Sequence, residues 1–235
     1  MVKNSLTLFA TNIVGLATVI LAVNPVHAIT IYNPTPTASV NTGTIATNFG
    51  ALANISNGNG LSGSGDILDQ THSAGGSTSN FWSGLLSNGA ALSDVNIDFD
   101  FGTQVELNTL ALWNYNAFNA SAVQRGIKDF QLILSNNSDF SSPLFTSGTL
   151  TLPIGLGTAS ISATPFSFAT TSARYARIDV ATNYGNASAI GLSEVRFANV
   201  TAVPEPLTIL GTFTALGFGT AFKAKRRNDS RKETR

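Results

Sequence analysis

Apolar and polar residues alternate with a period of two in several short segments of this chain. The segment 95–101 alternates in this way before Gly102, and the pattern recurs at 130–134, 176–180 and 194–197. Successive side chains of a strand point to opposite faces of a sheet, so this period predicts half-buried strands, the first of them ending in a turn at Gly102. No segment of the central part sustains an amphipathic helix. We therefore predict an all-β fold, an antiparallel β-sandwich or jelly roll.

The segments between these strands have distinct compositions. Residues 29–49 are rich in Thr, Pro and Asn, which favours an extended lead-in or an edge strand. Residues 54–80 hold many Gly, Ser and Asn residues, and we expect a long loop there. Residues 105–115 are apolar on both faces, as in a central strand that is covered on both sides. Trp82 and Trp113 stand in apolar surroundings and are expected in the core.

The chain of 235 residues contains no cysteine, which excludes disulfides and cysteine-ligated metal sites. Its 13 basic and 13 acidic residues balance overall, but seven of the basic residues lie in the last thirteen positions. Residues 29–203 hold five basic and ten acidic residues, a net charge of −5. A body of this sign argues against nucleic acid as a partner.

The N-terminal 28 residues have the composition of a secretory signal peptide. Lys3 precedes an apolar run at 6–23, and Pro25 then breaks the helix before Ala28. Small residues at this point predict cleavage after Ala28, so that 1–28 would be removed on export. The alternative is an uncleaved membrane anchor.

The C-terminal segment 201–235 has three parts. A Val-Pro-Glu-Pro signature precedes sixteen largely apolar residues at 207–222, and a basic tail follows. Sixteen helical residues span about 24 Å, which makes a short transmembrane helix. This order resembles the PEP-CTERM sorting signal of bacterial surface proteins. The resemblance implies an exosortase-type membrane protease as partner, a transient C-terminal membrane anchor and a cell-envelope or extracellular location, with the motif at Val203, Pro204, Glu205, Pro206, Lys225, Arg226 and Arg227.

The domain at 50–200 resembles the galactose-binding-like β-sandwich, the discoidin or factor V/VIII type C fold. The matching stretches are, in order, NIDFDFG at 96–102, LALWNYN at 110–116, RGIKDFQLILSNNSDF at 125–140, ARYARIDV at 173–180 and IGLSEVRF at 190–197. The resemblance implies a rigid sandwich whose loops carry recognition, on a fold that hosts many binding specificities.

Candidate catalytic groups are few. His72 is the only histidine left after the signal peptide, and we expect it to be solvated in its Gly/Ser-rich loop. Asp98 and Asp100 share one face of a strand and could imitate a glycosidase carboxylate pair, although a solvated outer face is the favoured interpretation. We therefore assign no catalytic residue and predict that the protein is not an enzyme.

The resemblance to the galactose-binding-like family also implies a structural calcium ion, held between an early loop and a glutamate of the last strand. The implied ligands are oxygen atoms, which calcium prefers. Here an asparagine at position 57 replaces the acid of the family's loop, which weakens the site. The alternative is that the asparagines are turn residues and that Glu194 pairs with Arg196 or Arg177. The implied calcium ligands are Asn57, Asn59, Ser62, Ser193 and Glu194.

Sugar binding requires an aromatic surface with hydrogen-bonding groups beside it, and loops on a rigid scaffold are the expected place. We expect extracellular carbohydrate, such as a polysaccharide, as the ligand. The alternative is a structural matrix or adhesion protein without a dedicated pocket. Tyr115 could equally face inward, and Arg125 could form a structural ion-pair group with Lys128 and Asp129. The candidate ligand-binding residues are Tyr115, Asn116, Phe118, Arg125, Asn183, Tyr184 and Asn186.

Overall fold

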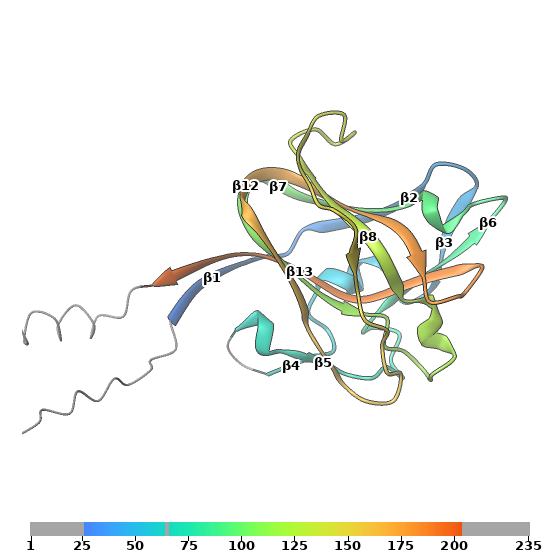
Figure 1. Ribbon diagram of the computed structural model, residues 1–235. Coiled ribbons are helices and arrows are strands. Elements are labelled where there is room, and N and C mark those ends of the chain that lie inside the picture. The colour runs from blue at the N-terminus through green and yellow to red at the C-terminus, as the bar shows by residue number, and fades with distance from the viewer. Residues whose placement is uncertain (1–25, 64–65, 204–235) are drawn as a thin grey trace, which may run out of the picture. The chain divides into compact units, whose positions relative to one another are not determined.

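The computed structural model describes residues 26–63 and 66–203, and within them His27–Ala202 forms one compact unit (Figure 1). The predicted signal peptide up to residue 25 lies outside the described residues, as do the predicted apolar helix and the sorting motif from Pro204 onward. Among the residues that are described, no helix is long and apolar enough to cross a membrane.

Strands and short 3-10 helices make up the described structure. The strands are β1 (Val26–Tyr32), β2 (Thr35–Val40), β3 (Thr44–Phe49), β4 (Leu61–Ser62), β5 (Thr71–His72), β6 (Trp82–Ser87), β7 (Val95–Asn114), β8 (Ile127–Ser135), β9 (Pro143–Thr146), β10 (Leu150–Thr151), β11 (Ile161–Ser162), β12 (Thr164–Asn183) and β13 (Ala189–Val203). The 3-10 helices are η1 (Leu52–Ser56), η2 (Ile67–Asp69), η3 (Leu92–Asp94) and η4 (Ala122–Arg125). The prediction of an all-β fold is therefore confirmed.

One large antiparallel sheet folds back on itself to form the two layers. Its strands follow the order β10-β8-β12-β7-β13-β6-β3, while β1 pairs with β13, β2 with β7 and β9 with β8. The 20-residue strands β7 and β12 belong to both layers. The first part of β7 pairs with β2 and the second part with β13, while β12 follows β7 over most of this course (Figure 1). Bulges in β12, such as that between Ala173 and Tyr175, allow the bend.

The core lies between the two layers and is lined by the apolar faces of the alternating segments. Phe99 and Phe197 are fully buried and meet edge to face, with 5.1 Å between their ring centroids. Trp82, Leu132 and Ile178 are buried in the same cluster. Each such side chain contributes about 1.5–3 kcal/mol through burial, which makes this cluster the main source of stability.

A second, three-stranded sheet of order β11-β5-β4 lies beside the large one. Trp113 of β7 packs with Ile67 of η2, and its indole N–H donates a hydrogen bond of 3.1 Å to the Gln70 carbonyl. Trp82 and Trp113 are both buried, which confirms their prediction as core residues. The indole of Trp113 thus attaches the small sheet to the sandwich.

Residues 29–49 form most of β1 and all of β2 and β3, and each of these strands pairs with a single strand of the main sheet. Other segments differ from the sequence interpretation. The predicted loop at 54–80 contains β4, η2 and β5, because apolar residues such as Ile67 and Leu61 pack against Trp113. Gly102 does not end the first predicted strand: with φ of 78° it lies inside the continuous strand β7. The predicted cleavage after Ala28 would remove the first three residues of β1.

Candidate binding site

Aromatic rings gather where β3 ends and where the chain leaves β7. Phe81 is fully buried, and Phe118 packs edge to face against it with 5.3 Å between centroids. Phe49, the last residue of β3, meets Phe118 at 5.5 Å in the same manner. Phe49 is 38% exposed and Phe118 is 41% exposed. The two rings therefore form a small apolar surface that is held from below by Phe81.

The backbone of Phe118 is in the left-handed region, with φ of 63°. A bulky residue rarely adopts this conformation, which costs on the order of 1–3 kcal/mol. The strand-like contact of this segment with Gly75 holds the conformation, because the amide of Phe118 donates to the Gly75 carbonyl at 2.8 Å. The fold thus maintains a strained backbone at a position whose side chain is partly exposed to solvent. Phe140 has the same backbone conformation, with φ of 56°, but its side chain is only 9% exposed, so the exposure of the ring distinguishes Phe118.

Arg125, the last residue of η4, borders this aromatic pair. Its guanidinium carbon lies 5.3 Å from the centroid of the Phe49 ring, a cation–π contact. The buried Nε and Nη1 atoms of Arg125 have no hydrogen-bond partner among the described residues, and neither do the hydroxyls of Tyr115 and Ser83. Burial raises the pKa of Tyr115, and the nearby Arg125 and Ser83 side chains oppose this rise. Three polar side chains thus stand close together behind the aromatic surface.

Asn116, a predicted ligand-binding residue, has a structural role. It is 1% exposed, and its Oδ1 accepts hydrogen bonds from the amides of Leu156 and Gly157 at 2.9 and 2.7 Å. Its Nδ2 donates to the Ala159 carbonyl at 2.9 Å. The side chain therefore fixes the loop that leads to β11.

The turn after β12 contains the other three predicted residues. Asn183 donates to the carbonyls of Asn186 and Ala189 at 2.7 and 3.0 Å. Tyr184 donates its hydroxyl proton to the Leu152 carbonyl at 2.7 Å. The amide of Asn186 donates to the carbonyl of Gln124, next to Arg125, at 3.4 Å. The turn thus borders the aromatic surface, while its side chains mainly shape the turn itself.

Asp98 and Asp100 line a different hollow of about 420 Å³, together with Phe140 and residues of β2. Each carboxylate is held by one arginine. Arg177 donates to Asp98 at 2.6 and 2.8 Å, and Arg174 donates to Asp100 at 3.0 and 3.1 Å. The hydrogen bond from Arg174 is the main cause that lowers the pKa of Asp100. Two carboxylates held in this way are poorly suited to general acid catalysis.

His72 is not the solvated loop residue that the sequence suggested. It lies on β5, is 1% exposed, and has 2.9 Å between its Nδ1 and the Ser73 carbonyl oxygen. Gly60 leaves room for the ring, since a Cβ at that glycine would lie 2.7 Å from the His72 Nε2. Burial lowers the pKa of His72, so the imidazole is neutral near pH 7.

The side chains implied as calcium ligands do not converge. Asn57 Oδ1 accepts from the amide of Asn59 at 2.8 Å, which is a local turn contact. Ser62 pairs with Thr71 across the small sheet, at 2.8 Å between hydroxyl oxygens. Ser193 Oγ accepts from the amide of Asn116 at 3.1 Å. The described residues also contain no cluster of three or more His, Cys, Asp or Glu side chains.

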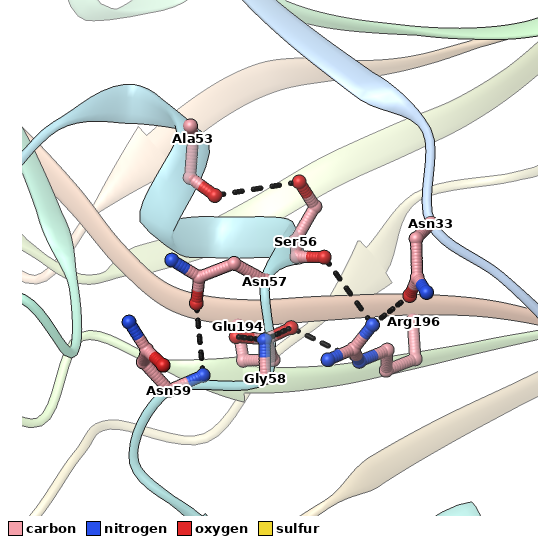
Figure 2. Close-up of polar contacts among 8 residues, drawn as sticks. All are labelled: Asn33, Ala53, Ser56, Asn57, Gly58, Asn59, Glu194 and Arg196. Atoms are coloured by element: carbon pink, nitrogen blue, oxygen red, sulfur yellow. Dashed lines mark hydrogen bonds and ion pairs between the residues drawn. The ribbon is translucent and has the colours of Figure 1, made fainter.

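Glu194, the remaining implied ligand, faces an arginine. Its carboxylate is fully buried, lies 3.0 Å from the Nε of Arg196, and accepts from the Gly58 amide at 3.2 and 3.3 Å (Figure 2). The Arg196 Nη1 also donates to the Ser56 carbonyl at 3.2 Å and to the Asn33 side chain. The guanidinium lies among these oxygen atoms, so the residues present do not fit a calcium ion there. Pairing of Glu194 with Arg196 is the alternative that the sequence left open.

The sequence interpretation did not include Phe49, Phe81 and Ser83 in the site. The signal for Phe49 was present, as a lone aromatic residue in a segment of Thr, Asn and Ala. Phe81 and Ser83 carried no such signal, because they lie at the start of an ordinary apolar strand. Of the seven predicted residues, Phe118, Arg125 and Tyr115 are brought together.

Comparison with known proteins finds similarity only at the level of structure. No family model matches the sequence, and no curated protein matches it. Among solved structures, the chain is similar to the CBM32 of AlyQ in complex with 4,5-unsaturated mannuronic acid, with 21% identity and a TM-score of 0.42. That match covers 72% of this chain and 97% of the other. A family 32 CBM from C. perfringens NanJ in complex with galactose has 12% identity and a TM-score of 0.43, over 73% of this chain and 100% of the other.

A third similar structure is a truncated AlyQ with CBM32 and alginate lyase domains. It has 22% identity and a TM-score of 0.46, and the match covers 77% of this chain. The chain spans 35% of the length of that protein.

Proposed function

We propose that this protein is a non-catalytic module that binds extracellular carbohydrate through the surface formed by Phe49, Phe118 and Arg125. The observation that carries the proposal is the exposed ring of Phe118, held on a strained backbone beside the guanidinium of Arg125. An unfavourable conformation is maintained at this position although the side chain contributes little to the core. A role in contact with a ligand accounts for both facts.

The chemistry of this surface suits a sugar ring. The apolar face of a sugar packs on aromatic side chains, while its hydroxyls require planar donors and acceptors at the edge. Phe49 and Phe118 provide the apolar surface, and the Nη2 of Arg125, the guanidinium nitrogen that is not buried, provides donors beside it. The hydroxyls of Tyr115 and Ser83 lie close to Arg125, without a hydrogen bond to its Nε or Nη1. All these groups come from segments anchored to the sandwich, so little ordering is needed on binding.

The absence of catalysis is part of the proposal. His72 is buried, and Asp98 and Asp100 are each held by an arginine in another hollow. The binding surface itself contains Arg125 but no carboxylate among its described residues. Binding without bond cleavage is therefore the function that these residues support.

The location is proposed from the two ends of the sequence. We infer export through a signal peptide that ends at Ala28, followed by exosortase-type processing at the signature that begins with Val203. Processing would leave the domain on the cell surface or release it. A mature protein from the culture medium that still carries its intact C-terminal tail would contradict this route.

A glycan array probed with the full chain tests the binding proposal. Neutral and acidic extracellular polysaccharides should be included, and bound glycans should be titrated with the wild-type protein and with Arg125→Lys. Arg125→Lys keeps the charge but loses the planar donor fork, so we expect affinity to fall at least tenfold. A folded wild-type protein that binds no glycan would favour the structural matrix or adhesion function instead.

A further inference from the structure

Arg196 lies at the meeting point of three segments that are far apart in the sequence. Its Nε lies 3.0 Å from the carboxylate of Glu194, and its Nη1 donates to the carbonyl of Ser56 at 3.2 Å and to the Oδ1 of Asn33 (Figure 2). One guanidinium thus joins β13, the end of η1 and the segment between β1 and β2. No other arginine of the described residues bridges three segments in this way, since Arg174 and Arg177 each hold one strand carboxylate.

The atoms around this guanidinium are of the kinds that hold a hard cation. A carboxylate, a backbone carbonyl and an amide oxygen are the usual ligands of calcium in proteins. Here Glu194, Ser56 and Asn33 provide one of each. Glu194 is fully buried and Arg196 is 8% exposed, so the positive charge replaces solvent inside the fold.

The loop after η1 is shaped around the arginine. Gly58 has φ of 81°, and a Cβ at this position would lie 2.5 Å from the Nη2 of Arg196. Its amide donates to both carboxylate oxygens of Glu194, at 3.2 and 3.3 Å. The bare backbone therefore passes directly over the ion pair, which a side chain at position 58 would prevent. This contact is independent of the oxygen atoms that surround the guanidinium.

We propose that the guanidinium of Arg196 replaces a structural metal ion, so that the fold of this domain is independent of calcium. The positive charge of Arg196 on β13 holds η1 and the segment between β1 and β2 in place, as a bound cation would hold its ligand loops. Since the charge is covalently attached, chelators cannot remove it. The loop then stays in place at any calcium concentration.

Thermal unfolding of the full chain at pH 8.5 tests the proposal, with 10 mM CaCl₂, 10 mM MgCl₂ or EDTA. We expect the melting temperature of the wild-type protein to agree within about 1 °C in all three conditions. Arg196→Ala should melt about 10 °C lower, because it leaves a buried carboxylate without its partner. It should also gain about 3–6 °C in CaCl₂ over MgCl₂, as expected for an ion held with a millimolar Kd.

Two further variants separate this role from that of an ordinary ion pair. Arg177→Ala removes a similar bidentate partner from Asp98 on the sheet face, and we expect no calcium response from it. Arg196→Ala combined with Glu194→Gln should lose the response of the single variant. If Arg196→Ala does not fold, Arg196→Gln replaces it, because glutamine fills part of the same volume without the charge, and it should show the same gain in CaCl₂ over MgCl₂.

Either of two results would overturn the proposal. One is a wild-type melting temperature that rises in CaCl₂ or falls in EDTA, which would show that the protein binds a metal of its own. The other is a folded Arg196→Ala variant that responds to CaCl₂ no more than Arg177→Ala does, which would make Arg196 an ordinary buried partner of Glu194.

Discussion

Glu194 and Arg196 form an ion pair inside the fold, with 3.0 Å between the Glu194 carboxylate and the Arg196 Nε. The two residues alternate on β13 with Val195 and Phe197, which face the core between the layers. The face of β13 that carries the pair is therefore also covered, here by the η1 loop and by Asn33. The polar residues that alternate with apolar ones on β13 thus lie on a second buried face of the strand, not on a solvent-exposed one.

The close approach of Gly58 to Arg196 predicts the effect of a small substitution. Gly58→Ala should lower the free energy of unfolding by about 2–4 kcal/mol, because alanine is strained at φ of 81° and its Cβ would meet the guanidinium. In the Arg196→Ala background the same change should cost only about 1–2 kcal/mol, since the clash is gone. Urea unfolding of the four proteins measures this coupling. An equal loss of unfolding free energy in both backgrounds would show that a Cβ at position 58 does not meet the Arg196 guanidinium.

The burial of Glu194 predicts a dependence of stability on pH. Desolvation raises the pKa of this carboxyl from its ordinary value of 4.5 to about 8, although Arg196 and the Gly58 amide oppose the rise. The folded protein therefore holds this proton more tightly than the unfolded chain does. The resulting stability is fully present below about pH 4.5 and is lost as the pH rises to about 8, by up to about 1.4 kcal/mol per pH unit.

Urea unfolding of the wild-type protein and of Glu194→Gln between pH 5 and 8 measures this contribution. Glutamine cannot titrate, so the difference in unfolding free energy between the two proteins should change steadily over this range. A constant difference would show that Glu194 keeps one protonation state throughout.

Titration of His72 should change the stability of the fold in the opposite direction, and at lower pH. Burial lowers its pKa from 6.5, so the unfolded chain binds the proton more readily than the folded protein does. The neutral imidazole of His72 therefore contributes to folding stability above about pH 6.5, and this contribution is lost as the pH falls below that value. The comparison is cleanest in the Glu194→Gln background, where His72→Gln should remove the loss between pH 6.5 and 5. A loss of the same size in both proteins would exclude His72 as its cause.

Much of the sandwich could be predicted from the period of two. The segments at 130–134 and 176–180 lie within β8 and β12, and their apolar residues are buried as expected. The period shows which residues share a face, but it does not show what covers the other face. For this reason the sequence did not predict the burial of Glu194 and Arg196 under residues 52–58.

The candidate binding surface was harder to predict, because it joins segments that are far apart in the sequence. Phe118 and Arg125 belong to one loop region and could be proposed together. Phe49 joins them only because β3 pairs with β6 and thereby ends beside Phe81. Such a contact depends on strand order, which local patterns do not contain.

The contacts of Trp113 with Ile67 and Gln70 predict that this side chain attaches the small sheet to the sandwich. Trp113→Phe keeps the apolar ring but removes the donor of the 3.1 Å hydrogen bond to the Gln70 carbonyl. The Gln70 carbonyl would lose this partner, so we expect a loss of about 1 kcal/mol in unfolding free energy. Hydrogen exchange should rise first in β4 and β5, while the centre of β7 stays protected. Uniform exchange over the whole domain would show that the small sheet unfolds only with the rest.

The ring of Phe118 is the most direct test of the binding surface. Asparagine tolerates the left-handed backbone, so Phe118→Asn removes the ring without adding strain. We expect at least a tenfold loss of affinity for the glycan that the wild-type protein binds, because the aromatic surface is halved. The unfolding free energy should change by less than about 1 kcal/mol, because the ring is 41% exposed and the strain is relieved.

Phe140 provides the matched control, since it has the same backbone conformation, with φ of 56°, in another part of the fold. It is 9% exposed and packs under the guanidinium of Arg177, with 4.1 Å to the ring centroid. Phe140→Asn should therefore lower stability more than Phe118→Asn does, yet leave glycan affinity unchanged. Isothermal titration with the same glycan compares the two variants. Equal affinity losses would mean that the aromatic surface around Phe118 has no special part in binding, and that the effect follows from loosening the sandwich.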